Sequence, residues 1–158
     1  MNRGKKLIIG LVILIIVLFI AILLYVNNLA KSGLPQYSGK LKLKGLSQGV
    51  TVYRDEYGIP HIYAKNEKDL YMATGFIMAQ DRMWQMDLLR RVTTGRLSEI
   101  FGKDMVDTDV LMRALQITKK SHYVIAHTDK DVVDKLQAFA LGVNQYLERN
   151  KNNLPLEF

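Results

Sequence analysis

The stretch Arg54-Asp-Glu-Tyr-Gly-Ile-Pro-His-Ile-Tyr-Ala64 predicts a β-hairpin. Two segments alternate β-branched or aromatic residues with other types, which is typical of strands: residues 50–54 and residues 59–64. The four residues between the two segments form a turn, in which Gly58 can adopt a positive φ. Pro60 stands at the start of the second strand, where its missing N–H is tolerated. We therefore expect two short antiparallel strands.

The same stretch also contains an acid-histidine combination. Asp55 and Glu56 precede His61, and carboxylates that orient an imidazole occur in many catalytic sites. However, adjacent residues on a turn point in different directions, so these two carboxylates form no acid–base pair. We expect one of them to accept hydrogen bonds from turn amides. We expect His61 to be a structural histidine that is hydrogen-bonded within the hairpin.

A long helix is predicted from Glu67 to about Thr93. Asn66 is its N-cap residue, Asp69 follows three residues later as in a capping box, and Gly95 ends the helix. Two neighbouring apolar rows make the helix apolar around much of its circumference, so it should be central and mostly buried. The first row is Leu70, Ala73, Ile77, Trp84 and Leu88, and the second is Met72, Phe76, Ala79, Met83 and Met86.

Polar residues are concentrated in the second half of this helix. Asp87 lies three and four residues before Arg90 and Arg91, the favourable order for ion pairs on a helix. A solvated polar stripe, a buried ion network and a catalytic site are three interpretations of such a cluster. We favour the ion network, because charge beside apolar rows is stable only when it is paired. The cluster comprises Gln80, Asp81, Arg82, Gln85, Asp87, Arg90 and Arg91.

Three further helices are expected after the long one. The first is short, from Arg96 to Phe101 before Gly102, and the second runs from about Asp109 to Thr118. The last begins with Thr128 as N-cap and Asp131 at the third position, and His122 and His127, which flank the helix-to-helix connection before it, should be solvated. Its core-facing residues are Val132, Leu136, Phe139, Ala140, Val143 and Leu147, and an exit loop spans 150–158.

The N-terminus predicts a membrane span. Leu7 to Val26 contains no charged residue, and at about 1.5 Å per residue it can cross a hydrocarbon core of roughly 30 Å. Arg3, Lys5 and Lys6 precede it, so the positive-inside rule makes 1–6 a cytoplasmic tag and places the rest of the chain outside. We interpret the span as an uncleaved signal anchor, with a cleaved signal peptide as the alternative.

A spacer is expected from residue 27 to residue 49. Lys40 to Gly45 alternates lysine with leucine, which is typical of a short edge strand whose lysines face water. A lysine-rich segment at the membrane surface is the rival interpretation.

Composition excludes several classes of function. Of the 158 residues, 49% are hydrophobic and 23% charged, as in a folded protein. The chain has no cysteine, which removes disulfides, thiolate catalysis and cysteine-based zinc sites. The net charge is +7, of which three charges belong to the N-terminal tag. No basic stripe is interleaved with aromatic residues, so nucleic acid is not an expected partner.

Three ordered blocks of sequence resemble the N-terminal part of penicillin acylases (penicillin amidases). The first contains Arg54, Asp55, Gly58, Pro60 and His61. The second is Ala79-Gln-Asp-Arg-x-x-Gln-Met86, with Gln80, Asp81, Arg82 and Gln85, and the third runs from Arg90-Arg91 through Gly95 to Glu99. Leu34-Pro35, Leu43-x-Gly-Leu46 and the ending Leu154 to Phe158 are also similar to family members. The likeness runs from about Leu34 to Phe158.

The resemblance implies a fold, an activity and partners. The fold is the αββα sandwich of N-terminal-nucleophile hydrolases, an α+β architecture, and residues 50–158 would be an incomplete first part of it. A precursor cuts itself into α and β subunits, and the new N-terminal serine of the β subunit attacks the amide, its own α-amino group acting as base. Substrates are N-acyl amides, including β-lactam side chains and acyl-homoserine lactones, and many members bind calcium.

The resemblance assigns no catalytic, substrate-binding or metal-binding residue to this chain. The nucleophile and the oxyanion donors belong to sequence after Phe158, and no ligand cluster for calcium is evident. We expect a segment of a bacterial membrane-anchored enzyme that is inactive alone, whose partners are the membrane, the rest of the α subunit and the β subunit. A stand-alone anchored interaction module without activity is the alternative.

Overall fold

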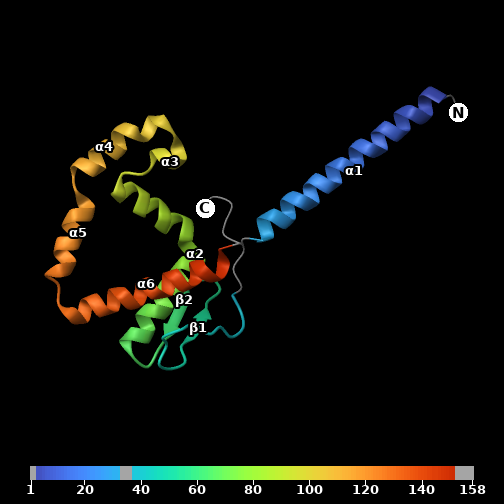
Figure 1. Cartoon of the computed structure of the whole chain (residues 1–158). Coiled ribbons are helices and arrows are strands. Elements are labelled where there is room, and N and C mark those ends of the chain that lie inside the picture. The colour runs from blue at the N-terminus through green and yellow to red at the C-terminus, as the bar shows by residue number, and fades with distance from the viewer. Residues whose placement is uncertain (1–2, 33–36, 152–158) are drawn as a thin grey trace. The chain divides into compact units, whose positions relative to one another are not determined.

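The computed structural model describes residues 3–32 and 37–151, which belong to two separate compact units. The first unit contains α1, a single helix from Arg3 to Ser32 (Figure 1). Within it, Ile8–Asn28 is long and apolar enough to cross a membrane, judged by length and composition. The helix thus extends six residues beyond the span expected at 7–26.

The second unit begins at Tyr37 and contains the predicted hairpin and helices. β1 (Thr51–Arg54) and β2 (Pro60–Tyr63) pair antiparallel, with Val52 opposite Ile62, so the predicted hairpin is confirmed. The helices are α2 (Glu67–Thr94), α3 (Ser98–Phe101), a 3₁₀ turn (Lys103–Met105), α4 (Val106–Ala114), α5 (Ile117–Ala126) and α6 (Lys130–Asn150). The described residues form only this two-stranded sheet, without the layers of a full αββα sandwich.

The caps of α2 are those predicted from the sequence. The Asn66 side chain accepts a hydrogen bond from the Asp69 amide at 2.8 Å. At the other end Gly95 has φ 65°, and its amide and that of Arg96 donate to carbonyls of the last turn. The second predicted row of α2 holds four buried members and one half-buried one, whereas the first row is mostly half-buried.

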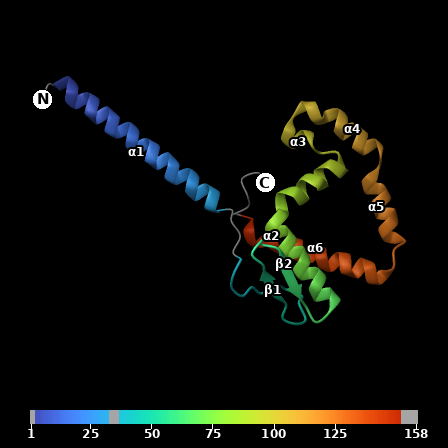
Figure 2. The same cartoon turned by 180° about the vertical axis from the view of Figure 1, so that it is seen from behind.

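Helices α2 and α6 lie side by side, and two glycines set their distance (Figures 1 and 2). A Cβ added to Gly142 would lie 2.0 Å from the Met72 carbonyl oxygen, and one added to Gly75 would lie 2.1 Å from that of Phe139. The two backbones are therefore in direct contact. Beside this contact, Phe76 and Tyr146 meet edge to face at 5.5 Å within the apolar core, which also contains Ala79 and Met83.

Asp69 joins the start of α2 to the segment before the hairpin. Its carboxylate accepts hydrogen bonds from the amides of Ser47 and Gln48, each at 2.9 Å, and from the Ser47 hydroxyl at 2.7 Å. The Asn66 side chain donates a further bond. Burial alone would raise the pKa of Asp69, but these donors together lower it from 3.8 to about 2.

The strand predicted at Lys40 to Gly45 does not form. The Gln145 side chain of α6 instead takes the place of a partner strand, because it accepts from the Lys44 amide at 2.6 Å and donates to the Lys44 carbonyl at 3.0 Å. Leu43 packs against the apolar core, so part of the expected spacer belongs to the packed unit. The alternation of lysine and leucine in this segment thus reflects the inward packing of Leu43 and not pairing with another strand.

The predicted helix from Asp109 to Thr118 is wrong in its bounds. The chain forms α4 and α5 instead, separated at Gln116, which has a left-handed conformation with φ 53°. Glutamine rarely adopts this conformation, so no residue type signalled the break. Thr128 is likewise not the N-cap of α6, because its hydroxyl donates to the Val124 carbonyl at the end of α5. Asp129 is the N-cap.

The core face predicted for α6 is only partly correct. Its buried residues are Ala138, Gly142 and Tyr146: the first two are small enough for the close contact with α2, and Tyr146 packs on Phe76. Val143 and Leu147 pack beside them, whereas Leu136 is 53% exposed. The predicted exit loop lies outside the described residues, apart from the last residue of α6 and Lys151.

The contact at Gly142 predicts that alanine at this position lowers the free energy of unfolding, which is the opposite of its usual effect in a helix. An alanine in a helix interior is ordinarily more stable than glycine by about 1 kcal/mol. For Gly142→Ala we expect the opposite, a loss of about 1–3 kcal/mol, because the new methyl group meets backbone that cannot move aside. Urea unfolding of the full chain in a non-ionic detergent, followed by the fluorescence of Trp84, measures this free energy.

Gly49→Ala is the matched control, because a Cβ there meets nothing within 4 Å. It should leave the urea midpoint nearly unchanged. A Gly142→Ala chain that is more stable than the parent would contradict the contact.

Asp69 predicts loss of stability in acid. Its pKa in the folded chain is about 2, below the ordinary value of 3.8, so its stabilisation is complete above about pH 4 and is lost as pH falls toward 2. The urea midpoint should therefore fall between pH 4 and pH 2. Asp69→Asn should lower the midpoint at pH 7 and reduce this dependence, and an unchanged pH profile in that variant would exclude the role.

Candidate functional site

The turn of the hairpin is organised by Asp55. One carboxylate oxygen accepts from the amides of Tyr57 and Ile59, each at 2.9 Å, and the other lies 3.1 Å from Nε2 of His61. The hydrogen bond from His61 is the largest cause of the lowered pKa of Asp55, followed by the Ile59 amide. These contacts confirm the predicted local bonding of both residues and account for the acid-histidine combination as turn structure.

Arg54 connects the hairpin to α2. Its two terminal nitrogens donate to both carboxylate oxygens of Asp81, at 2.9 and 2.8 Å, in a bidentate ion pair. The same guanidinium donates to the Gln80 side chain and to the carbonyl of Gly58. Arg54 and Asp81 are each about four-fifths buried. One side chain therefore fixes the turn, the strand and the helix against each other.

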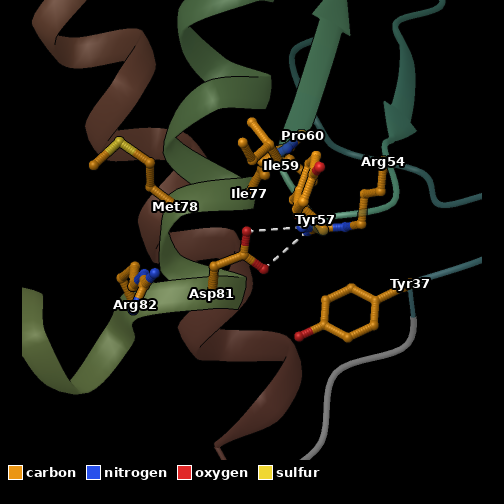
Figure 3. A pocket seen from close by; sticks show the side chains of 10 residues that line it. Tyr37, Arg54, Tyr57, Ile59, Pro60, Ile77, Met78, Asp81 and Arg82 are labelled. Carbon is orange, nitrogen blue, oxygen red and sulfur yellow. Dashed lines mark hydrogen bonds and ion pairs between the residues drawn. The ribbon is translucent and has the colours of Figure 1, made fainter.

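An open crevice of about 620 Å³ lies beside this ion pair (Figure 3). The ring of Tyr37 forms one wall, with the Arg54 guanidinium carbon 4.4 Å from the ring centre in a cation–π contact. Arg82 borders the crevice, is exposed, and marks a kink inside α2. The remaining lining residues are Tyr57, Gly58, Ile59, Pro60, Ile77, Met78 and Asp81.

Among the described residues that line the crevice, no nucleophile is paired with a base. None of its lining residues is a serine, threonine, cysteine, lysine or histidine. Its one carboxylate, that of Asp81, is engaged by Arg54 through both oxygens. The arrangement can bind an apolar group beside a fixed charge pair, and it supplies no general base.

A second polar cluster of the chain is the ion network at the end of α2. Asp87 is only 7% exposed and accepts from Arg90 at 2.6 Å and from Arg91 at 2.7 Å. Burial would raise the pKa of Asp87, but the hydrogen bonds from Arg91 and Arg90 hold it below its usual range. Arg91 and Arg96 both bind Glu99, which extends the network to α3. Of the cluster expected to form a buried ion network, Asp87, Arg90 and Arg91 do so around the buried Asp87, Asp81 pairs with Arg54 instead, and Arg82 and Gln85 are exposed.

Asp109 was not found from the sequence. It is buried, and its carboxylate accepts from the amides of Leu97 and Ser98 and from the Ser98 hydroxyl, at 2.6–2.9 Å. Arg113, one turn later in α4, donates to the Gly95 carbonyl. Asp109 thus binds the start of α3 as Asp69 binds the segment at Ser47 and Gln48. In the sequence this contact appears only as a serine and a carboxylate eleven residues apart, and such a pair has no local signature.

The described residues hold no catalytic constellation. Ser47 and Ser98 donate to carboxylates and Ser121 to a backbone carbonyl, while His127 bonds the Tyr123 carbonyl. In the described part of the chain, no three histidine, aspartate or glutamate side chains converge to hold a metal. Among the signature residues, Arg54, Asp55, Asp81 and Glu99 make the contacts described above, whereas Arg82 and Gln85 are exposed.

Comparison with known proteins gives relatives of one kind. A family model described as penicillin amidase matches residues 49–158. Penicillin acylase 2 proenzyme of Pseudomonas sp. (strain SE83) is 41% identical over 81% of this chain. An acyl-homoserine lactone acylase QuiP of Pseudomonas fluorescens (strain Pf0-1) is 37% identical over 80% of this chain, and penicillin G acylase of Escherichia coli is 35% identical over 71%.

A solved structure and the extent of these matches complete the comparison. The thermostable penicillin G acylase of Alcaligenes faecalis matches with a TM-score of 0.63 and 35% identity, over 71% of this chain and 61% of that one. The chain spans only 14–16% of the length of the three curated relatives named above. The match of the family model covers well over half of the chain and includes all three sequence blocks, so the chain belongs to the penicillin amidase family.

Proposed function

We propose that the chain is the N-terminal segment of the α subunit of a membrane-anchored penicillin-acylase-type amidohydrolase. The complete enzyme would cleave N-acyl amide bonds, such as those of β-lactam side chains or acyl-homoserine lactones, the substrates named for its relatives. Its partners would be the rest of the α subunit and a β subunit from the same precursor, and its fold the αββα sandwich. Calcium would belong to the complete enzyme.

The observation that carries this proposal is an apolar surface on α4, α5 and α6. The side chains of Val110, Val124 and Leu136 are each more than half exposed. Exposed apolar residues occur along three consecutive helices, which is unusual for the surface of a monomeric protein. A segment that aligns with about one sixth of its relatives would bury this surface against the remainder. Other members are Val106, Leu111, Leu115, Tyr123, Ile125, Val132 and Leu141.

The chain alone should not hydrolyse amides. The serine that the family resemblance makes the nucleophile belongs to sequence beyond the part that aligns here, and no described serine bonds a histidine. Heat-sensitive release of the reporter from a chromogenic acyl amide by the purified chain would disprove this.

A chimera tests whether this segment can serve as part of an acylase. Residues 49–158 would replace the matching part of the Pseudomonas penicillin acylase 2 proenzyme. We expect cleavage into two subunits, seen on a denaturing gel, and hydrolysis of a chromogenic acyl amide. Asp81→Ala in the chimera should lower the yield of processed enzyme several-fold, because it leaves the largely buried Arg54 without its partner.

Glu56→Ala is the matched control in the chimera, since it removes an exposed carboxylate from the hairpin turn next to Arg54. It should process like the unmodified chimera. A chimera that stays uncleaved and inactive, while the parent proenzyme is cleaved and active beside it, would contradict the proposed function.

We also propose that α1 anchors the chain in a bacterial cell membrane, with residues 1–6 in the cytoplasm and the bulk of the chain outside. Its length and its apolar stretch support the anchor, and the three charges before the span stand against Lys31, Lys40, Lys42 and Lys44 after it, so fusions decide the orientation. Alkaline phosphatase fused after Phe158 should be active, and a green fluorescent protein fused there should be dark. The reverse pattern would disprove the orientation, and loss of an N-terminal tag from the membrane fraction would indicate a cleaved signal peptide.

A further inference from the structure

A cluster of cations lies on the segment that follows the N-terminal helix. Lys40, Lys42 and Lys44 are exposed, as is Arg149 in the last turn of α6. Arg149 donates to the Lys42 carbonyl at 3.4 Å, which brings the two parts of the cluster together. Glu148 is the acidic residue beside them. We call Lys40, Lys42, Lys44 and Arg149 the basic patch.

The backbone of the packed unit holds these lysines outward. Leu43 is turned inward onto the apolar core, and the Lys44 amide and carbonyl are both bound by the Gln145 side chain. Because neighbours in an extended segment point to opposite sides, an inward Leu43 directs Lys42 and Lys44 to solvent. In the described structure none of the three lysines has a carboxylate partner, since every ion pair found involves other residues.

The length of the chain limits how far the patch can be from a membrane. The span ends at Asn28, α1 continues to Ser32, and eight residues lead from there to Lys40. At about 1.5 Å per helical residue and at most about 3.6 Å per extended residue, Lys40 is no more than roughly 35 Å from the end of the span. Every copy of an anchored chain therefore holds its patch within easy reach of the lipid headgroups.

We propose that the basic patch binds anionic phospholipid headgroups of the membrane in which α1 is anchored. Lysine and arginine side chains held close to a surface of anionic lipid are attracted to it, and tethering removes most of the entropic cost of the encounter. Binding would hold the face of the unit that carries the 40–44 segment against the membrane. The inference rests on the proposed anchor and goes beyond the proposed enzymatic function.

Chemical labelling of the full chain in vesicles tests the proposal. The chain is reconstituted into vesicles of phosphatidylcholine, with or without 30 mol% phosphatidylglycerol, and treated with a membrane-impermeant amine reagent. Mass spectrometry then gives the labelling of each lysine. We expect Lys40, Lys42 and Lys44 to be labelled at least about threefold more slowly in the anionic vesicles, because their ammonium groups are held among phosphates. In 1 M salt, where the Debye length is about 3 Å, this difference should disappear.

Lys119 and Lys120 on α5 are the internal controls, because both are exposed and lie outside the patch. Their labelling should be equal in the two kinds of vesicle. Equal labelling of the patch lysines in both kinds would overturn the proposal. So would equal protection in both, which would indicate burial against protein. Resistance of the chain to carbonate extraction is measured on the same samples, so a failed anchor is distinguished from a failed patch.

A variant gives an independent readout. The chain has no cysteine, so Ser38→Cys accepts a single fluorophore that reports the polarity next to the patch. Its emission should shift to the blue in anionic vesicles, and the triple substitution K40Q/K42Q/K44Q should abolish the shift. The substitution K119Q/K120Q removes two lysine charges outside the patch and should leave the shift intact. A shift that survives the triple substitution would also overturn the proposal.

Discussion

The packing of this chain depends on the contact between the backbones of α2 and α6. Gly75 and Gly142 each face a carbonyl of the opposite helix, at distances that no side chain could occupy. The contact brings Phe76 and Tyr146 together and lets Leu43 close the same core from outside the helices. The hairpin and the 37–49 segment are attached to this pair through Arg54, Asp69 and Gln145.

Carboxylates attach the surrounding segments to the helix pair. Asp69 binds two amides of the segment before the hairpin, and Asp109 binds two amides at the start of α3. Asp81 holds the hairpin through Arg54. Each carboxylate receives several donors from one partner segment, so it specifies a position as well as adding stability. This explains why the sequence blocks that identify the family are rich in charge and yet contain no catalytic group that the described structure can assign.

The parts of the fold that could be predicted are those with local signals. The hairpin followed from Gly58 and Pro60, the caps of α2 from Asn66 and Gly95, and the buried ion network from the spacing of Asp87 and its arginines. The glycine contact could not be predicted, because a glycine within a helical pattern does not reveal what lies opposite it. Asp109 and Gln145 act on residues 11 and 101 positions away, and neither distance has a sequence signature.

The prediction for α6 differed from the structure for a related reason. Apolar periodicity indicates which residues will be covered in the complete protein. It does not indicate which segment covers them. Leu136 was predicted to face the core, and it is exposed in a chain that spans about one sixth of its relatives. Under the proposed function, the apolar periodicity that includes Leu136 and its exposure in this chain agree. The rest of the enzyme would cover this side chain.

The central claim is therefore that α4, α5 and the exposed apolar residues of α6 (Val132, Leu136 and Leu141) are stably packed only when the rest of an acylase covers them. Hydrogen exchange of these helices, measured in the full chain alone and within the chimeric acylase, tests it most directly. The account predicts rapid exchange of the amides of α4 and α5 in the chain alone and strong protection in the chimera, with α2 protected in both. Equal protection of α4 and α5 in the two proteins would contradict it, because the chain would then be complete without a partner.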